Sequence, residues 1–226
     1  MLLARSNRAC PSETAGSMKH VRSAMWSRVF GTQRSERLRL VWNAARPSRI
    51  WHRIDSASRS LADPSTIGIA RRFRSNDGIY GIIDQTVYRE PGKDDEGASS
   101  FVRAVGSPGD RNLVDLYLDA GIGYRGQLPN RNNDTAGMAV SYARISPSAR
   151  GADWDTILET GIAMTRRWFE ALVEATYQAV LGPGVTVQPN LQYVFHPGGN
   201  IPDPRDPTGQ HNKNAKVVGV RATLTY

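Results

Sequence analysis

The chain has 226 residues and a mass of 24.9 kDa, of which 39% are hydrophobic, and its mean hydropathy is −0.46. No run approaches the 18 or so apolar residues of a spanning helix, which excludes a bundle of membrane helices but not a β-barrel, whose alternating faces average to a polar composition. The net charge is +8, and Cys10 is the only cysteine, which excludes an intramolecular disulfide and a Cys-based metal cage.

The basic excess is confined to the first third of the chain. Residues 1–77 hold 15 basic and 5 acidic residues, a net +10, whereas residues 78–226 hold 14 and 16, a net −2. We therefore divide the chain into an Arg/Ser-rich extension, 1–77, and a second region, 78–226. The extension shows no apolar run with a cleavage site that would mark a secretory signal.

Two interpretations of the extension remain open. Its composition favours a disordered or non-native segment, such as a shifted reading frame or a misplaced start would produce. Alternatively, residues 21–40 form a basic amphipathic helix that binds nucleic acid or an anionic membrane surface. We favour the first, and expect no nucleic-acid partner.

From Gly78 onward, segments of about ten residues alternate apolar with polar or small residues, between clusters of Gly, Pro, Asn and Asp. This pattern predicts antiparallel strands of the length that a tilted membrane strand needs. The seven expected strands are 79–89, 99–107, 112–124, 135–146, 168–181, 185–195 and 214–226.

Three of these segments alternate cleanly. On segment 112–124, Leu116 and Leu118 share one side, while Asp115 and Asp119 share the other. Segments 168–181 and 214–226 repeat the pattern, but the facing of segment 99–107 is ambiguous. A period of two collects the charges on one face, whereas a helix would scatter them. A soluble β-sandwich lectin gives the same alternation and remains an alternative.

Aromatic residues near strand ends favour the membrane barrel. They resemble the aromatic girdles of the two membrane interfaces, and they are Tyr124, Tyr142, Phe169, Tyr193, Phe195 and Tyr226. The chain stops on Leu224 and Tyr226, which resembles the signal that outer-membrane assembly machinery reads. With the C-terminus in the periplasm, residues 182–184 form a short turn, and 146–167 and 196–213 form long external loops. Barrels of this kind prefer short periplasmic turns and long external loops. Two connections depart from that preference, because 108–111 is then external yet short and 125–134 is periplasmic yet long.

Six stretches in a shared order resemble the carbohydrate-selective porin family, often called OprB. They are residues 78–85, 110–115, 141–146, 170–178, 187–193 and 196–200. The resemblance implies an all-β fold, an antiparallel transmembrane β-barrel of 16 strands, of which this chain resembles the last seven. It also implies the outer membrane of a Gram-negative bacterium, passive diffusion of monosaccharides, and lipid as a partner; homo-oligomers are left open. Seven strands with open edges do not close a wide barrel, so we expect a truncated copy.

A porin makes and breaks no bonds, so we expect no enzyme, no catalytic residue, no cofactor and no metal. Sugar hydroxyls both donate and accept hydrogen bonds, and carboxylates, amides and guanidinium groups form hydrogen bonds with them. The candidate pore-lining residues are Asp84, Asp115, Asp119, Glu170, Glu174, Gln178, Gln188, Asn190, Gln192 and Arg221. Paired carboxylates would also suit a glycosidase, and Asp203 with Asp206 would suit calcium; in both cases we favour solvated polar residues.

Overall fold

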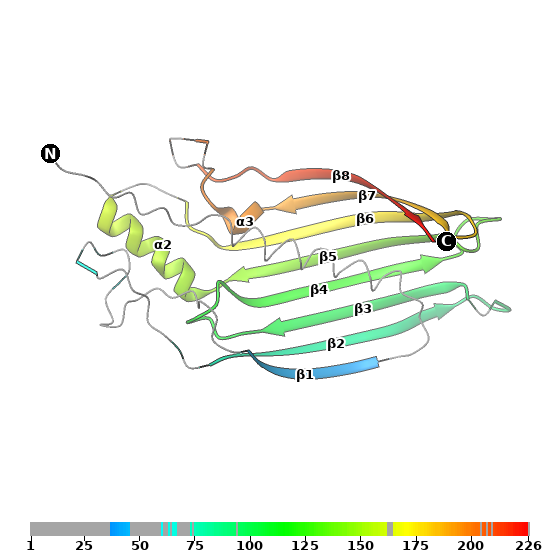
Figure 1. Ribbon diagram of the computed structural model, residues 1–226, viewed down its shortest axis with the longest axis horizontal. Coiled ribbons are helices and arrows are strands. Elements are labelled where there is room, and N and C mark those ends of the chain that lie inside the picture. Colours follow the sequence, from blue (N-terminus) through cyan, green and yellow to red (C-terminus); the bar gives the residue numbers. More distant parts are fainter. Residues whose placement is uncertain are drawn as a thin grey trace.

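The computed structural model describes the backbone of residues 37–45 and, in full, residues 60, 63, 65, 66, 73, 75–93, 95–161, 165–203, 205, 206, 208 and 210–225. These residues form one antiparallel sheet in which every strand pairs with its neighbours in sequence, in the order β1 to β8 (Figure 1). The strands are β1 (Arg37–Ala45), β2 (Asn76–Arg89), β3 (Gly97–Gly106), β4 (Val114–Arg125), β5 (Thr135–Ile145), β6 (Phe169–Gly182), β7 (Val185–Phe195) and β8 (Ala215–Leu224).

Strands β2 to β8 lie where the alternation predicts the seven strands, so the all-β antiparallel fold class is confirmed. An eighth strand, β1, lies upstream of the expected boundary at residue 78 and pairs with β2 from Arg37 opposite Asp84 to Ala45 opposite Asn76. The sheet therefore extends into the segment assigned to the extension. The basic residues of this segment obscure the alternation from which a strand would be predicted. Most of residues 1–75 lie outside the described part of the chain.

Two helices lie at the same end of the sheet (Figure 1). Helix α2 (Pro147–Thr160) occupies part of the segment for which we expected only a loop. Its limits are set by capping, because the Ser146 hydroxyl accepts a hydrogen bond from Ala149 N, Pro147 begins the helix, and Gly161 ends it in the left-handed conformation. Helix α3 (Pro197–Asn200) is a single turn. Within the described residues, no helix combines the length and apolar character that a membrane span requires.

The connections differ between the two ends of the sheet. The end that bears α2 and α3 also carries the connections 107–113, 146–168 and 196–214, while the other end carries 90–96, 126–134 and the turn at 183–184. The expected strands around 107–113 and 126–134 are correctly placed. The exceptions to the loop-length rule at these two connections therefore come from the rule and not from a misplaced strand.

One face of the sheet, which we call the apolar face, exposes large hydrophobic side chains on every strand from β2 to β8. They include Ile79, Ile83, Val102, Leu118, Ile122, Met138, Val140, Val173, Leu191, Val218 and Val220, all between 37% and 77% exposed. Gln85 and Ser100, opposite each other, are polar exceptions on this face. The described residues form a single sheet with no second sheet against this face, which a soluble sandwich would require.

Aromatic side chains border the apolar face at both ends. Tyr88 and Tyr124 stack at 6.2 Å between ring centroids near one end. Tyr142 and Phe169, at 5.3 Å, and Tyr193 and Phe195, at 4.6 Å, lie near the other. On β6, Phe169 and Tyr177 belong to opposite ends, about 26 Å apart along the strand at ~3.3 Å per residue. This separation is comparable with the apolar band of about 25 Å in membrane barrels.

Candidate functional site

The opposite face, which we call the polar face, carries the ionisable and amide side chains of the sheet. The registers of β2 to β8 place on it Asp84, Asp119, Glu170, Glu174, Gln178, Gln188, Asn190, Gln192 and Arg221. Asp115, the tenth predicted residue, lies at an irregularity of the β4–β5 register. The registers also resolve β3, whose Phe101 and Arg103 face the polar side. The sequence of β3 alone does not indicate this facing, because its polar and apolar residues do not alternate clearly.

An ion pair crosses the centre of the polar face. Arg103 on β3 lies opposite Asp119 on β4, and Arg103 Nε donates to Asp119 Oδ1 at 2.9 Å, while Nη2 donates to Oδ2. The Asp119 side chain is fully buried, and that of Arg103 is 13% exposed. The guanidinium also lies 5.4 Å from the ring centroid of Tyr117. Arg103 and Tyr117 are not among the residues predicted from the sequence, and the pairing of β3 with β4 brings them to Asp119.

A second group of polar contacts links β6 to β7. Gln192 Nε2 donates to Glu174 Oε1 at 2.7 Å, and the Glu174 side chain is buried at 1% exposure. Gln188 Nε2 donates to the hydroxyl of Thr176 at 3.2 Å, and that hydroxyl donates to Pro189 O at 2.9 Å. The structure thus brings two predicted residues, Glu174 and Gln192, into direct contact, and identifies Thr176 as the bridge to Gln188.

Two other predicted carboxylates hold neighbouring segments in place. Glu170 Oε2 accepts a hydrogen bond from the backbone N of Gly198 in α3 at 2.6 Å. Asp115 forms a two-pronged ion pair with Arg144, at 2.9 and 3.0 Å. The pairs Asp115/Asp119 and Glu170/Glu174, which would suit a glycosidase, therefore have all four carboxylates engaged with donors of the protein.

Three of the remaining predicted residues, Gln178, Gln188 and Arg221, lie on the polar face toward the end where the β6–β7 turn lies. Gln188 lies directly opposite Arg221 across β7 and β8, and Gln178 lies opposite Thr135 on the other side of β6. Arg221 is exposed. Asn190 lies opposite Gly219, and its Oδ1 is buried with no hydrogen-bond partner among the described residues. Asp84 lies opposite Phe101, next to the apolar cluster of Phe101, Ala139, Leu172 and Val194.

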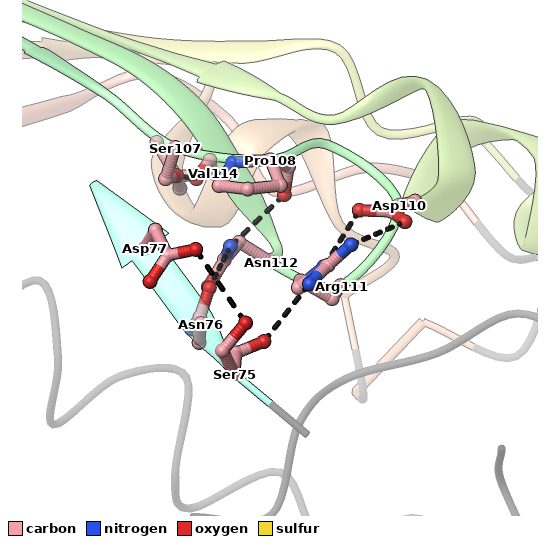
Figure 2. A network of polar contacts seen from close by, with 9 residues as sticks. All are labelled: Ser75, Asn76, Asp77, Ser107, Pro108, Asp110, Arg111, Asn112 and Val114. Carbon is pink, nitrogen blue, oxygen red and sulfur yellow. Dashed lines mark hydrogen bonds and ion pairs between the residues drawn. The ribbon is translucent and has the colours of Figure 1, made fainter. Parts of the chain in front are cut away.

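A polar network secures the start of β2 to the connection 107–113 (Figure 2). Asn76 and Asn112 exchange two side-chain hydrogen bonds, at 2.7 and 2.8 Å, and Asn112 also donates to Pro108 O at 2.9 Å. Arg111 donates to Ser75 O at 2.9 Å and pairs with Asp110. These contacts define one rim of the sheet, at the end that bears α2 and α3.

The loop carboxylates considered for calcium serve local turns. Asp203 Oδ1 accepts from Arg205 N, and Asp206 Oδ1 accepts from both the N and the hydroxyl of Thr208. The Thr208 hydrogen bonds lower the pKa of Asp206, since they favour its charged form. Among the described residues, no group of three or more His, Cys, Asp or Glu side chains is placed to hold a metal ion.

Comparisons with protein-family models, with curated proteins and with solved structures all indicate the same family. Residues 29–226 match the model of the family described as "Carbohydrate-selective porin, OprB family", a match that includes β1. Porin B of Pseudomonas aeruginosa is 24% identical over 201 residues, which cover 83% of this chain and 42% of that protein. The structure titled "High pH structure of Pseudomonas putida OprB" superposes with a TM-score of 0.72 at 22% identity, over 83% of this chain and 44% of that one. The chain thus spans less than half the length of these relatives.

Proposed function

The chain belongs to the carbohydrate-selective porin family, OprB, and we propose that its polar face lines a water-filled pore through which monosaccharides diffuse passively. The apolar face then contacts the lipid of the outer membrane of a Gram-negative bacterium. The observation that carries this proposal is the separation of the two faces, with exposed Val, Ile and Leu on one, and buried carboxylates beside half-buried amides and the arginines Arg103 and Arg221 on the other. Alternation of this kind is how a β-barrel presents lipid and water simultaneously.

The chemistry of the polar face suits sugars. Each sugar hydroxyl both donates and accepts hydrogen bonds. A wall with carboxylates, amides and a guanidinium group therefore offers it both acceptors and donors. Gln178, Gln188 and Arg221 are the predicted pore-lining residues that we assign to direct sugar contact, because Arg221 is exposed and lies opposite Gln188. Asp119, Glu170 and Glu174 we assign to organisation of the wall, since each is engaged by a neighbouring donor at close range.

The described sheet is open between β1 and β8. Each unpaired backbone group in lipid costs several kcal/mol, so a working pore pairs both edges. We propose that the eight strands form part of the wall of a wider barrel, of the 16-strand class that leaves an aqueous channel. The proposal includes recognition of Leu224 and Tyr226 by the barrel assembly machinery.

A chimera tests the proposal without depending on closure by this chain alone. The part of Porin B that precedes its match to this chain is joined to the whole chain and produced in a porin-deficient Gram-negative strain. We expect the chimera in the outer-membrane fraction, migration on gels that changes with heating, and swelling of liposomes in isotonic glucose but not in a large oligosaccharide. Porin B cut at the same point, without this chain, is the control. A chimera that enters the membrane and passes no glucose contradicts the proposal.

A further inference from the structure

A tight turn follows β7 at the end of the sheet that bears α2. We call residues 196–200 the mouth turn; it comprises His196 and α3. The backbone φ angle is positive at His196 (47°), Gly198 (73°), Gly199 (80°) and Asn200 (76°), a left-handed run that reverses the chain within a few residues. Hydrogen bonds from Gly199 N and Asn200 N to His196 O, at 2.8 and 3.2 Å, close it. The chain therefore bends sharply at the end of β7 instead of continuing outward.

The mouth turn is attached to the polar face. Gly198 N donates to the carboxylate of Glu170 at 2.6 Å, and Trp168 N donates to Gly199 O at 2.8 Å. Gly199 is buried against Ile145, which is itself fully buried, so closely that a Cβ at this glycine would lie 2.7 Å from Ile145 Cγ1. The side chains of Glu170 and Ile145 belong to β6 and β5 on the polar side. Gly198 and Gly199 of the turn therefore lie against the polar side of β5 and β6, while the ring of His196 meets the ring of Phe169 edge-on at 4.6 Å between centroids, at the rim of the sheet.

We infer that the mouth turn narrows the pore at this end, and that Glu170 is the positioning residue that holds it against the wall. The inference rests on the proposed function, because the polar face has a lumen only if the barrel closes. It changes the role expected for Glu170, whose carboxylate faces the lumen but is occupied by Gly198 N. A buried carboxylate that accepts a backbone N–H in this way fixes the position of the turn more firmly than a neutral acceptor would.

The first experiment measures amide hydrogen exchange of residues 196–201 in the full chain folded in detergent micelles. We expect Glu170→Ala to accelerate exchange about tenfold, the order expected for loss of one charge-assisted hydrogen bond, and Glu170→Gln to have a smaller effect because its amide oxygen still accepts. Glu174→Ala is the matched control, since Glu174 lies on the same strand and face but is bonded to Gln192. It should leave exchange of the mouth turn unchanged. Equal exchange in Glu170→Ala and the unaltered chain overturns the positioning role.

The second experiment records single channels of the Porin B chimera, which contains the whole chain. Glu170→Ala should raise the single-channel conductance and the current noise. Gly199→Ala displaces the turn from the Ile145 side and should do the same with Glu170 intact, so that the result does not depend on one variant folding. Faster exchange with unchanged conductance overturns the narrowing role. An unaltered chimera that forms no channels counts against the proposed function, and the exchange measurement still decides whether Glu170 holds the turn.

Discussion

The guanidinium of Arg103 and the carboxylate of Asp119 meet as a two-pronged ion pair between directly opposed residues of β3 and β4. The pair lies on the polar face with the Asp119 side chain fully buried. Its geometry satisfies both oxygens of Asp119, which is the condition under which a buried charge is tolerated. Such a pair fixes how β3 and β4 face each other, which the sequence of β3 alone left ambiguous.

Removing one partner of this pair should be strongly destabilising. We expect Arg103→Ala to lower the free energy of unfolding in detergent micelles by about 3–5 kcal/mol, because Asp119 then remains as an unpaired buried charge. Equilibrium urea titration of the full chain measures the loss. The control replaces both partners, Arg103→Met with Asp119→Leu, and should lose far less. Equal losses in the single and double variants would contradict a buried pair.

Gly121 leaves space for the ring of Phe101 on the adjacent strand. A Cβ at Gly121 would lie 2.6 Å from Phe101 Cε1 and 3.1 Å from Ala139 Cβ. We expect Gly121→Ala to cost about 1–3 kcal/mol of unfolding free energy through overpacking, measured by the same titration. Phe101→Leu should recover part of this loss in the double variant. Gly106→Ala, whose Cβ would meet its nearest neighbour at 3.6 Å, is the control and should cost less.

A charge introduced at one of two adjacent residues of β5 should destabilise the folded protein far more than the same charge at the other. Val140 lies on the apolar face and is 51% exposed, whereas Ser141 lies on the polar face. We expect Val140→Arg in the Porin B chimera to make folding into lipid vesicles less favourable by about 2–4 kcal/mol, the cost of arginine near the bilayer midplane. Ser141→Arg should fold into vesicles with a smaller penalty. If both variants fold equally well, the apolar face does not contact lipid.

Asp134 should make the connection between β4 and β5 sensitive to acid. Burial acts to raise the pKa of Asp134, but hydrogen bonds from Tyr177 Oη, Val180 N and Arg131 outweigh it and hold the pKa below its usual value. A depressed folded-state pKa contributes stability that is present above the unfolded value of about 4 and is lost as the pH falls through the folded-state pKa.

The unfolding midpoint of the unaltered chain should therefore fall more steeply below about pH 4 than that of Asp134→Asn. Thermal unfolding in detergent micelles between pH 3 and pH 7 measures both. Tyr177→Phe removes one of the hydrogen bonds and should reduce the difference without abolishing it. Parallel pH profiles for Asp134→Asn and the unaltered chain would show that Asp134 contributes no such linkage.

The sequence by itself determined the positions of β2 to β8 and the facing of most of them, because a period of two is a local property of each strand. It also indicated the family, which the comparisons confirm. It could not show β1, whose alternation is obscured by arginines, or α2, whose limits depend on capping at Ser146 and Gly161 and not on an apolar stripe. The candidate residues of the polar face were predicted as a set, without their partners.

Only the tertiary structure decided which of those residues are engaged by other groups of the protein. Arg103 meets Asp119, Gln192 meets Glu174, and Gly198 meets Glu170 through pairing and turns that join residues distant in the sequence. The alternation of residues along a strand indicates on which side of the sheet a side chain lies. The register between strands determines which donor lies beside which acceptor. For that physical reason the two faces could be predicted from one sequence, and the partners of Glu170 and Asp119 could not.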